Sequence, residues 1–523
     1  MIAGIMSIVR FILFMFFRVL ITGIVLSAAV ITSASAQKVP ADPVLDNPAS
    51  QNSGDQPENK SSKNMNVDMQ LTYGQYNNMF STISLSHEQE KFVYLLNSQF
   101  KRSNDYGYGK TIYSNTSYYE NNIGFTGNLN AGDGWKTIFD GSVDNESHGM
   151  YENPVYTREE KEKYSLSAVN IIRQSSSFEW NTSANVAGYT HRLAARDSDN
   201  DEKSSLLKLK GSLGGEIIWS ASNRLRFNVD GTWYRYNVAD VDNDDFVKGE
   251  MIDDFRLLSF LRMSIGLNGA WAKNGGALIM GRLSRPGDSS RKIPVPVNPT
   301  GSLSLFGNDI VSVTFQYRHE MEPFRAENFY FEQKYVYPEY DLSPTRSHVG
   351  EGRIDIKGGD YVWFKGGCVV KKSDDFYDYV ADEAMVLRAH KLDTTMLIAK
   401  GDGSVTVPGS GVQVVMGYEY SHYYTSEHIT YRPAHSVTSA LKYNGSVLNI
   451  EWSNRYQSRV YTDPEKNGRL KSSVIGFLGA QVQMLTGFYS YLRVENLYNN
   501  KYYLRDGYPE AGLTVLGGLR ILL

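Results

Sequence analysis

The chain has 523 residues and a formal net charge of −4, with 36 tyrosines, 46 glycines and only 16 prolines. Aromatic residues are enriched in strands, so this composition favours β structure over helix. The sequence has no long basic run, which argues against a nucleic-acid-binding protein, because such proteins present clustered Lys and Arg to phosphates. The single cysteine, Cys368, cannot form an internal disulfide or a two-cysteine metal motif.

The N-terminus has the features of an export signal. Arg10 and Arg18 stand before an apolar stretch from Val19 to Val30, and a small-x-small pattern ending at Ala36 suits signal peptidase. We therefore predict a removable signal over residues 1–36. The alternative is an N-terminal membrane anchor, because the apolar stretch and the residues before it are together long enough to span a bilayer.

The next segment, residues 37–65, is rich in Pro, Asn, Ser, Asp and Lys. Such a segment buries too little apolar surface to offset the entropy lost on ordering. We expect a disordered segment on the periplasmic side of the membrane, between the signal and a barrel that covers residues 66–523.

From Val67 to the C-terminus, apolar and polar residues alternate with the period of two that is typical of strands. In residues 206–236, Leu207, Leu209 and Leu213 share one face, and charged residues occupy the other. The strands run to about ten residues or more, the length that crosses a bilayer at a tilt. We expect apolar faces toward lipid and polar faces toward a lumen. The candidate lumen-lining residues are Lys101, Glu179, Lys208, Lys210, Glu216, Arg226 and Asp230.

After the signal, the sequence contains no apolar run of helix-spanning length, so a membrane location requires a closed barrel without unpaired edges. Short connections, residues 87–90 and 221–224, alternate with longer ones at residues 104–115, 195–205 and 238–254. Bacterial outer-membrane barrels alternate short periplasmic turns and long external loops in the same way. The sequence therefore predicts an all-β, closed antiparallel transmembrane barrel.

Catalytic and metal motifs are weak. HEQEK at residues 87–91 lacks the second histidine of a zinc protease helix. Asp240, Asp242 and Asp244 match the start of a calcium loop, but Asp245 stands where glycine is needed and Met251 where glutamate is needed. A solvated loop is the favoured interpretation, with weak divalent-cation or lipopolysaccharide contact as the alternative. We expect no enzyme activity, no cofactor and no metal.

Several segments resemble the barrel domain of TonB-dependent outer-membrane receptors. Residues 71–109 are similar to the first three barrel strands of that family, residues 322–356 to a middle segment, and residues 434–463 and 491–523 to its final strands. The resemblance implies a barrel of about 22 strands, and a smaller number of strands is the alternative. It also implies uptake of a scarce solute, such as a metal chelate, vitamin or oligosaccharide, with a TonB-type energy-coupling partner.

Family members carry a plug domain of more than one hundred residues before the barrel, whereas only residues 37–65 separate the predicted signal from the first strand. We therefore expect no plug in this chain. An empty lumen of about 22 strands would be a very wide hole. Four arrangements stay open: fewer strands, inward-folded loops, a plug on another polypeptide, or an open pore. The corresponding functions are a receptor-type transporter, a porin-like diffusion channel, and a non-transporting adhesion or scaffold barrel.

The chain ends on an alternating apolar strand. Val515, Leu519, Ile521 and Leu523 are expected to face lipid, while the strand pairs with the first strand near residues 67–74. The same four residues resemble the signal that outer-membrane barrel assembly machinery recognises, although many barrels end on Phe. The expected partners are this machinery, outer-membrane lipid and lipopolysaccharide, and a plug or TonB-type protein in trans, without nucleic acid.

Overall fold

The computed structural model describes residues 65–523, with gaps. The predicted signal, the predicted disordered segment and two aspartates of the calcium-like motif, Asp240 and Asp242, lie outside the described residues. Within the part of the chain that is described, no helix has the length and apolarity needed to cross a membrane. The undescribed positions are 1–64, 90, 109, 133, 198–200, 221, 238–242, 274–275, 280–281, 285–297, 306–309, 323–343 and 466–467.

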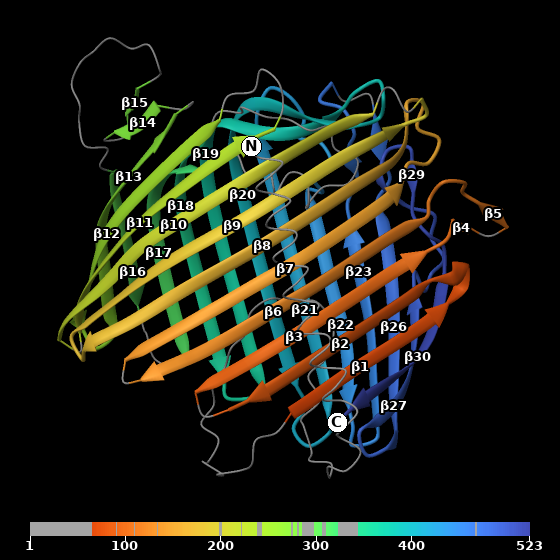
Figure 1. The fold of residues 1–523 in the computed structure, drawn as a ribbon, viewed down its shortest axis with the longest axis horizontal. Helices are drawn as coiled ribbons and strands as arrows, with labels where there is room; N and C mark the ends of the chain where they lie inside the picture. The colour runs from red at the N-terminus through yellow and green to blue at the C-terminus, as the bar shows by residue number, and fades with distance from the viewer. Residues whose placement is uncertain are drawn as a thin grey trace.

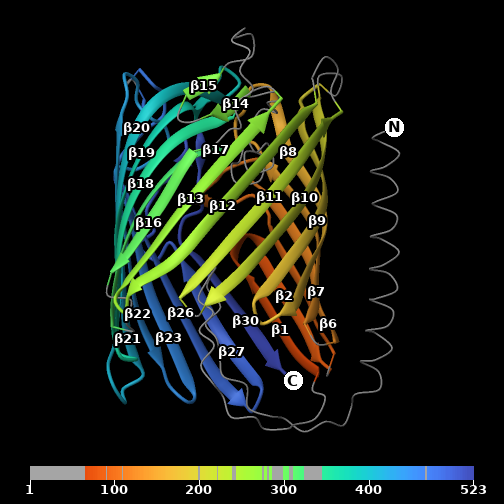
Figure 2. The same cartoon turned by 90° about the vertical axis from the view of Figure 1, so that its left-hand side faces the viewer.

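The described strands form one continuous antiparallel sheet of 24 members, which closes on itself (Figures 1 and 2). Two of them, β14 (Gly276–Ile279) and β15 (Arg282–Ser284), form a hairpin that extends from β13 at one end. The remaining 22 make the ring, which confirms the predicted closed barrel.

The ring strands follow one another in chain order. They are β1 (Met65–Gly74), β2 (Met79–Glu88), β3 (Phe92–Ser103), β6 (Tyr118–Gly132), β7 (Trp135–Gly149), β8 (Tyr156–Ser175), β9 (Phe178–Ala195), β10 (Glu202–Ser220), β11 (Asn223–Tyr236), β12 (Asp244–Leu258), β13 (Leu261–Ala272), β16 (Asn298–Leu305), β17 (Val311–Glu322), β18 (Thr345–Gly358), β19 (Val362–Ala381), β20 (Leu387–Thr406), β21 (Val412–Tyr424), β22 (His435–Asn444), β23 (Leu448–Gln457), β26 (Ser473–Leu485), β27 (Phe488–Glu495) and β30 (Thr514–Leu522).

The ring closes where β30 pairs with β1. Leu519 lies opposite Leu71, and the backbone N–H and C=O groups of Val67 and Leu523 bond each other in both directions at 2.9 Å. On the other face of this seam, Arg520 donates two hydrogen bonds to the Asp68 carboxylate, at 3.0 and 2.7 Å. The last strand therefore leaves no unpaired edge, as the sequence predicts.

The two faces of the sheet differ in character. On one face, Leu71, Leu209, Trp233 and Leu519 are large apolar side chains that remain 38–51% exposed. On the other face, Leu206 of β10 packs with Leu387 of β20, although these strands are not neighbours in the ring. Side chains of distant strands can meet only through the interior, so Leu206 and the residues in register with it point inward.

The two ends of the barrel also differ. β1 begins and β30 ends at one end, called here the terminal end, where the connections have at most five residues, as in 407–411. At the opposite end, called the loop end, longer connections carry the short strands β4 (Gly107–Tyr108), β5 (Thr111–Ile112), β24 (Val460–Tyr461), β25 (Arg469–Leu470), β28 (Tyr503–Arg505) and β29 (Tyr508–Pro509).

The predicted bounds of two long connections, residues 195–205 and 238–254, are wrong because the following strands begin earlier than expected. β10 begins at Glu202 and β12 at Asp244, so residues 202–205 of the first segment and 244–254 of the second are strand. Asp245 is compatible with strand β12 because it is paired, accepting from Arg235 at 2.7 Å. Asp201, directly before β10, accepts from Arg192 at 2.5 Å. The connection over residues 104–115 agrees with prediction, since it joins β3 to β6.

Replacing both Ile521 and Leu523 by Asp is expected to remove most of the protein from the membrane fraction. The change places two charges on the apolar face of the closing strand, where lipid cannot solvate them. The measurement is the amount of heat-modifiable barrel in urea-washed membranes. Leu504→Asp, at an exposed site of β28, is the control and should assemble normally. Normal insertion of the double variant would contradict the expectation.

Arg520→Gln should lower the free energy of unfolding by about 1.5–3 kcal/mol, because it leaves the Asp68 carboxylate without its two charge-assisted hydrogen bonds. The measurement is urea-induced unfolding in lipid vesicles. Adding Asp68→Asn to this variant should recover part of the loss, since the pair is then removed together. Two independent, additive losses would argue against the coupling.

Candidate functional site

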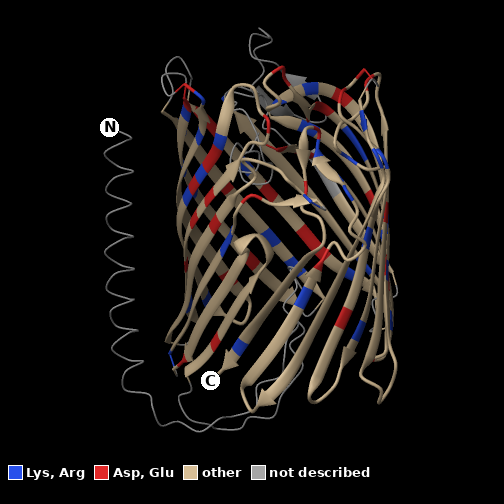
Figure 3. Cartoon of the chain, turned by 90° about the vertical axis from the view of Figure 1, so that its right-hand side faces the viewer, with Lys and Arg blue, Asp and Glu red and all other residues tan. Residues whose placement is uncertain are grey.

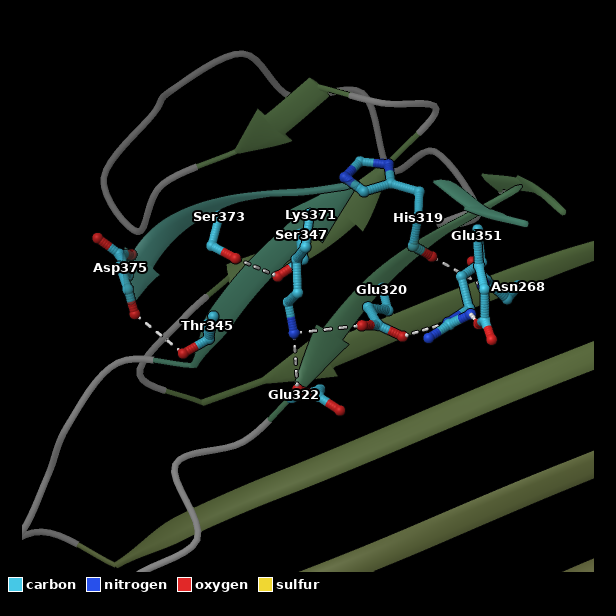
Figure 4. A network of polar contacts seen from close by, with 11 residues as sticks. Asn268, His319, Glu320, Glu322, Thr345, Ser347, Glu351, Lys371, Ser373 and Asp375 are labelled. Atoms are coloured by element: carbon cyan, nitrogen blue, oxygen red, sulfur yellow. Dashed lines mark hydrogen bonds and ion pairs between the residues drawn. The ribbon is translucent and has the colours of Figure 1, made fainter. Parts of the chain in front are cut away.

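Acidic and basic residues are interleaved along the barrel strands (Figure 3). Some of them form ion pairs on the inner wall. Between β17 and β19, Lys371 Nζ lies 3.4 Å from Glu320 and 3.5 Å from Glu322 (Figure 4). Arg318 binds Glu320 at 3.0 Å and Glu351 at 3.2 Å. Each of these five charged side chains therefore has a partner of opposite charge, so this part of the inner wall is polar but carries no large excess of one charge.

Six of the seven candidate lumen residues lie together on β9, β10 and β11. Glu216 is in register with Glu179 on one side and Arg226 on the other. Lys208 and Lys210, on the same face, are in register with Ala187 and Asn185 of β9. Asp230 lies opposite Ser212, also on that face. This is the face of Leu206, so the register turns all six inward. Lys101 lies elsewhere on the inner wall, on β3, 3.6 Å from Glu120.

At the terminal end, a cavity of about 290 Å³ opens from this wall. Arg224 binds Glu216 at 3.1 Å, and Arg226 binds Asp254 at 2.7 Å. These pairs are half-exposed, and such pairs contribute little to stability. The sequence pattern located Glu216 and Arg226 but missed the other charged residues of the cavity. Its lining residues are Glu216, Ser222, Arg224, Arg226, Asp254 and Arg262.

At the loop end, three connections from different parts of the ring meet at one side chain, that of Asn153. Its Nδ2 donates to the carbonyl of Ala384, between β19 and β20, at 2.6 Å, and it also contacts the Tyr508 hydroxyl of β29 at 3.0 Å. Its Oδ1 accepts from the backbone N–H groups of Val155 and Tyr156, at 2.9 and 2.8 Å. The Asn153 side chain is 0% exposed, and these four hydrogen bonds satisfy both its donor and its acceptor atoms without water.

Apolar contacts surround this meeting point. One cluster joins Met150, Tyr156 and Leu193, from one part of the ring, to Val386 and Tyr508 from others. A second cluster joins side chains of β9, β10 and β11 to Leu387 of β20 and is flanked by Tyr431 from the connection between β21 and β22. Burial of Tyr431 raises the pKa of its hydroxyl to about 12, so the ring stays neutral. The connections therefore fill part of the interior with a packed apolar core.

Buried charges lie beneath these connections. Glu159 is 0% exposed and accepts from Lys161 at 3.3 Å and from His191 at 3.1 Å. Asp378 of β19 accepts from the backbone N–H of Thr430 at 2.7 Å and lies 3.9 Å from Arg432. Because buried charges cost free energy unless paired, the contacts of Asp378 favour the docked position of the β21–β22 connection, whereas the contacts of Glu159 join neighbouring wall strands.

The connection between β3 and β6 is fixed to the one between β27 and β30. The N–H of Gly512 donates to the carbonyl of Gly107 at 2.9 Å. A Cβ at Gly107 would clash with the Thr111 backbone, so only glycine fits there. Asn115 donates to the carbonyl of Met150 at 3.0 Å, which extends the contact to the β7–β8 connection. Sequence reasoning missed this network, and its only signal is the Tyr, Asn and Gly content of these connections.

The weak metal motifs do not assemble. Within the described residues, no three His, Cys, Asp or Glu side chains lie together as a metal site. His87 lies one residue before the end of β2 and contacts Gln89 at 3.1 Å. Asp244 and Met251 both belong to β12, so the second half of the calcium-like motif is strand rather than loop.

Comparisons with known proteins identify the fold. No protein-family model matches the sequence, and no curated protein matches it. Among solved structures, the copper transporter OprC is 13% identical, with a TM-score of 0.68 over 90% of this chain and 82% of that chain. The FrpB iron transporter from Neisseria meningitidis is 12% identical, with a TM-score of 0.69 over 88% and 82% of the two chains.

A third structure, the ferric enterobactin receptor PfeA of Pseudomonas aeruginosa in complex with enterobactin, is 10% identical and has a TM-score of 0.65. It covers 88% of this chain and 81% of that chain. These neighbours are TonB-dependent receptors, the family that residues 71–109, 322–356, 434–463 and 491–523 resemble. The chain therefore has the barrel fold of the TonB-dependent outer-membrane receptors.

Proposed function

We propose that this protein is an integral outer-membrane barrel that transports a solute, with its terminal end toward the periplasm and its loop end toward the outside. The structures of similar fold include two transporters and a receptor by their titles, which supports transport rather than enzymatic chemistry. The belt of exposed apolar side chains on the outer face supports a location in lipid. The predicted assembly residues, Val515, Leu519, Ile521 and Leu523, would belong to this belt.

One observation carries the proposed mechanism: Asn153 joins the β7–β8, β19–β20 and β27–β30 connections inside the loop end. In the family that the sequence resembles, a plug domain fills the barrel. We propose that this chain has no plug of its own, and that its docked connections restrict passage instead. Energy coupling would come from a plug or TonB-type partner in trans.

This arrangement favours a gated transporter over a permanently open diffusion channel. Val386 and Tyr508, from two of these connections, are buried in one cluster with Leu193 of β9, so docked residues occupy part of the interior at the loop end. Undocking would have to break the contacts of Asn153 and expose this cluster to water. When the connections move, the inner-wall residues Glu179, Lys208, Lys210, Glu216, Arg226, Asp230 and Lys101 would line the path.

Purified protein in a planar bilayer is expected to be nearly silent, and Asn153→Ala should give frequent, large openings. The substitution removes a buried hydrogen-bonded amide, a loss of about 1–3 kcal/mol. That change would raise the population of undocked connections roughly 5- to 150-fold. Asn130→Ala, near the terminal end, is the matched control and should stay silent. Steady, wild-type conductance equal to that of the variant would rule out gating by the connections.

In the Asn153→Ala background, replacing Lys208 and Lys210 by Glu should shift ion selectivity toward cations by at least about twofold in permeability ratio, because both side chains would line the path. The measurement is the reversal potential in a KCl gradient. Lys203→Glu, on the opposite face of the same strand, is the control and should leave the reversal potential unchanged. Equal shifts from both faces would contradict the assignment of the path.

A further inference from the structure

A second cavity, of about 310 Å³, lies at the loop end between the inner wall and two docked connections. The connections are those between β3 and β6 and between β27 and β30, which the Gly512–Gly107 hydrogen bond holds together. Its volume is at the lower end of the range for small-molecule sites in proteins. It is separate from the arginine-rich cavity at the terminal end and from the cluster around Asn153.

Five phenol or phenyl rings contribute to the lining of this cavity. The rings are Tyr76, Tyr106, Tyr118, Phe477 and Tyr502. Two of the hydroxyls are tied back to the protein, since Tyr76 donates to the carbonyl of Gly107 and Tyr118 to Asn78 Oδ1, each at 3.3 Å. Tyr118 also stacks on His148 with ring centroids 6.4 Å apart. Rings held in this way can present their electron-rich faces to an occupant.

The charges around the cavity are mainly negative. Glu495 and Glu510 line it, while no Lys or Arg is found among the described residues that do so. His148, which also lines it, lies 3.6 Å from Glu146 and 4.0 Å from Glu120. Arg493 lies at the border, where it binds Glu495 at 2.7 Å and stacks over Phe477 at 5.0 Å.

The environment of two tyrosines is consistent with this negative field. Burial, and after it the Glu510 carboxylate, raise the pKa of both Tyr106 and Tyr502. The Glu510 charge therefore acts on the interior of the cavity, and a cation placed among these rings would be stabilised by the same charge. The neutral phenol rings would remain available for cation–π contacts at any physiological pH.

We propose that this cavity binds a small organic cation of the alkylammonium class, held by the aromatic rings and by the Glu510 carboxylate. Such a cation has a weakly hydrated, apolar surface, so it loses little hydration when it enters an aromatic site, and aromatic cages are the common solution for it. Only the further step, that the bound cation is also the transported solute, rests on the proposed function.

The site would also couple binding to the docked state. Tyr106, Tyr502 and Glu510 belong to the two connections, whereas Tyr118 and Phe477 belong to wall strands β6 and β26. An occupant that touches both groups binds the docked arrangement better than an undocked one. It therefore shifts the population of connections by its difference in affinity for the two states.

The test is calorimetric titration of choline into the purified full-length barrel in detergent, compared with 3,3-dimethyl-1-butanol, its neutral isostere. We expect saturable choline binding and at least tenfold weaker binding of the isostere. Glu510→Gln and Tyr106→Leu should each weaken choline binding at least fivefold, whereas Tyr502→Phe, which keeps the ring, should bind like wild type. Glu88→Gln, at the terminal end, is the charge-matched control. Heat-modifiable mobility reports whether each variant is folded.

Several results would overturn the proposal: no choline binding by the wild-type barrel, equal binding of choline and the isostere, or unchanged affinity in folded Glu510→Gln. The titration does not depend on conductance. A barrel that binds choline but conducts in the wild-type state would therefore refute the gate and leave the cation site intact. A wild-type barrel that is silent but does not bind choline would refute the cation site and leave the proposed gate intact.

Discussion

The rest of the structure depends on the pairing of the last strand with the first. In hydrocarbon, every backbone N–H and C=O group must be satisfied within the protein, so a sheet that spans lipid must close. The hydrogen bonds between Val67 and Leu523 complete that ring, and Arg520 with Asp68 adds a charge-assisted contact on its inner face. Once the ring is closed, each strand has one face toward the outside and one toward the interior, which accounts for the alternation along the barrel strands.

Closure of 22 strands creates a second problem, because wall side chains alone cannot fill so wide an interior. The protein meets it differently at its two ends. Toward the terminal end, the wall is lined with paired charges such as Arg226 and Asp254, which tolerate water. At the loop end, connections fold inward, bury Leu193 and Val386 against each other, and satisfy their polar groups through Asn153. Apolar burial and hydrogen bonding there offset the entropy lost by ordering long connections.

Much of the fold could be predicted because period-two alternation is a local property. It identified the strands around Lys208 and Arg226, the inward direction of their charges and the apolar face of the closing strand. It failed where a strand carries acidic residues: residues 244–254 resemble a solvated loop, yet they belong to β12, where a partner on the neighbouring strand, Arg235, binds Asp245. A single segment contains no information about such cross-strand partners.

The sequence by itself determined that this protein is a closed barrel with an apolar outer face, since facing and closure follow from the side-chain period and from the absence of helix-length apolar runs. Only the tertiary structure decided what occupies the interior. Asn153 and Ala384 are separated by 231 positions, and Tyr106 and Tyr502 line one cavity from opposite parts of the chain. Such contacts exist only after the ring has closed, because closure brings connections from distant strands to the same end and turns them toward a shared space.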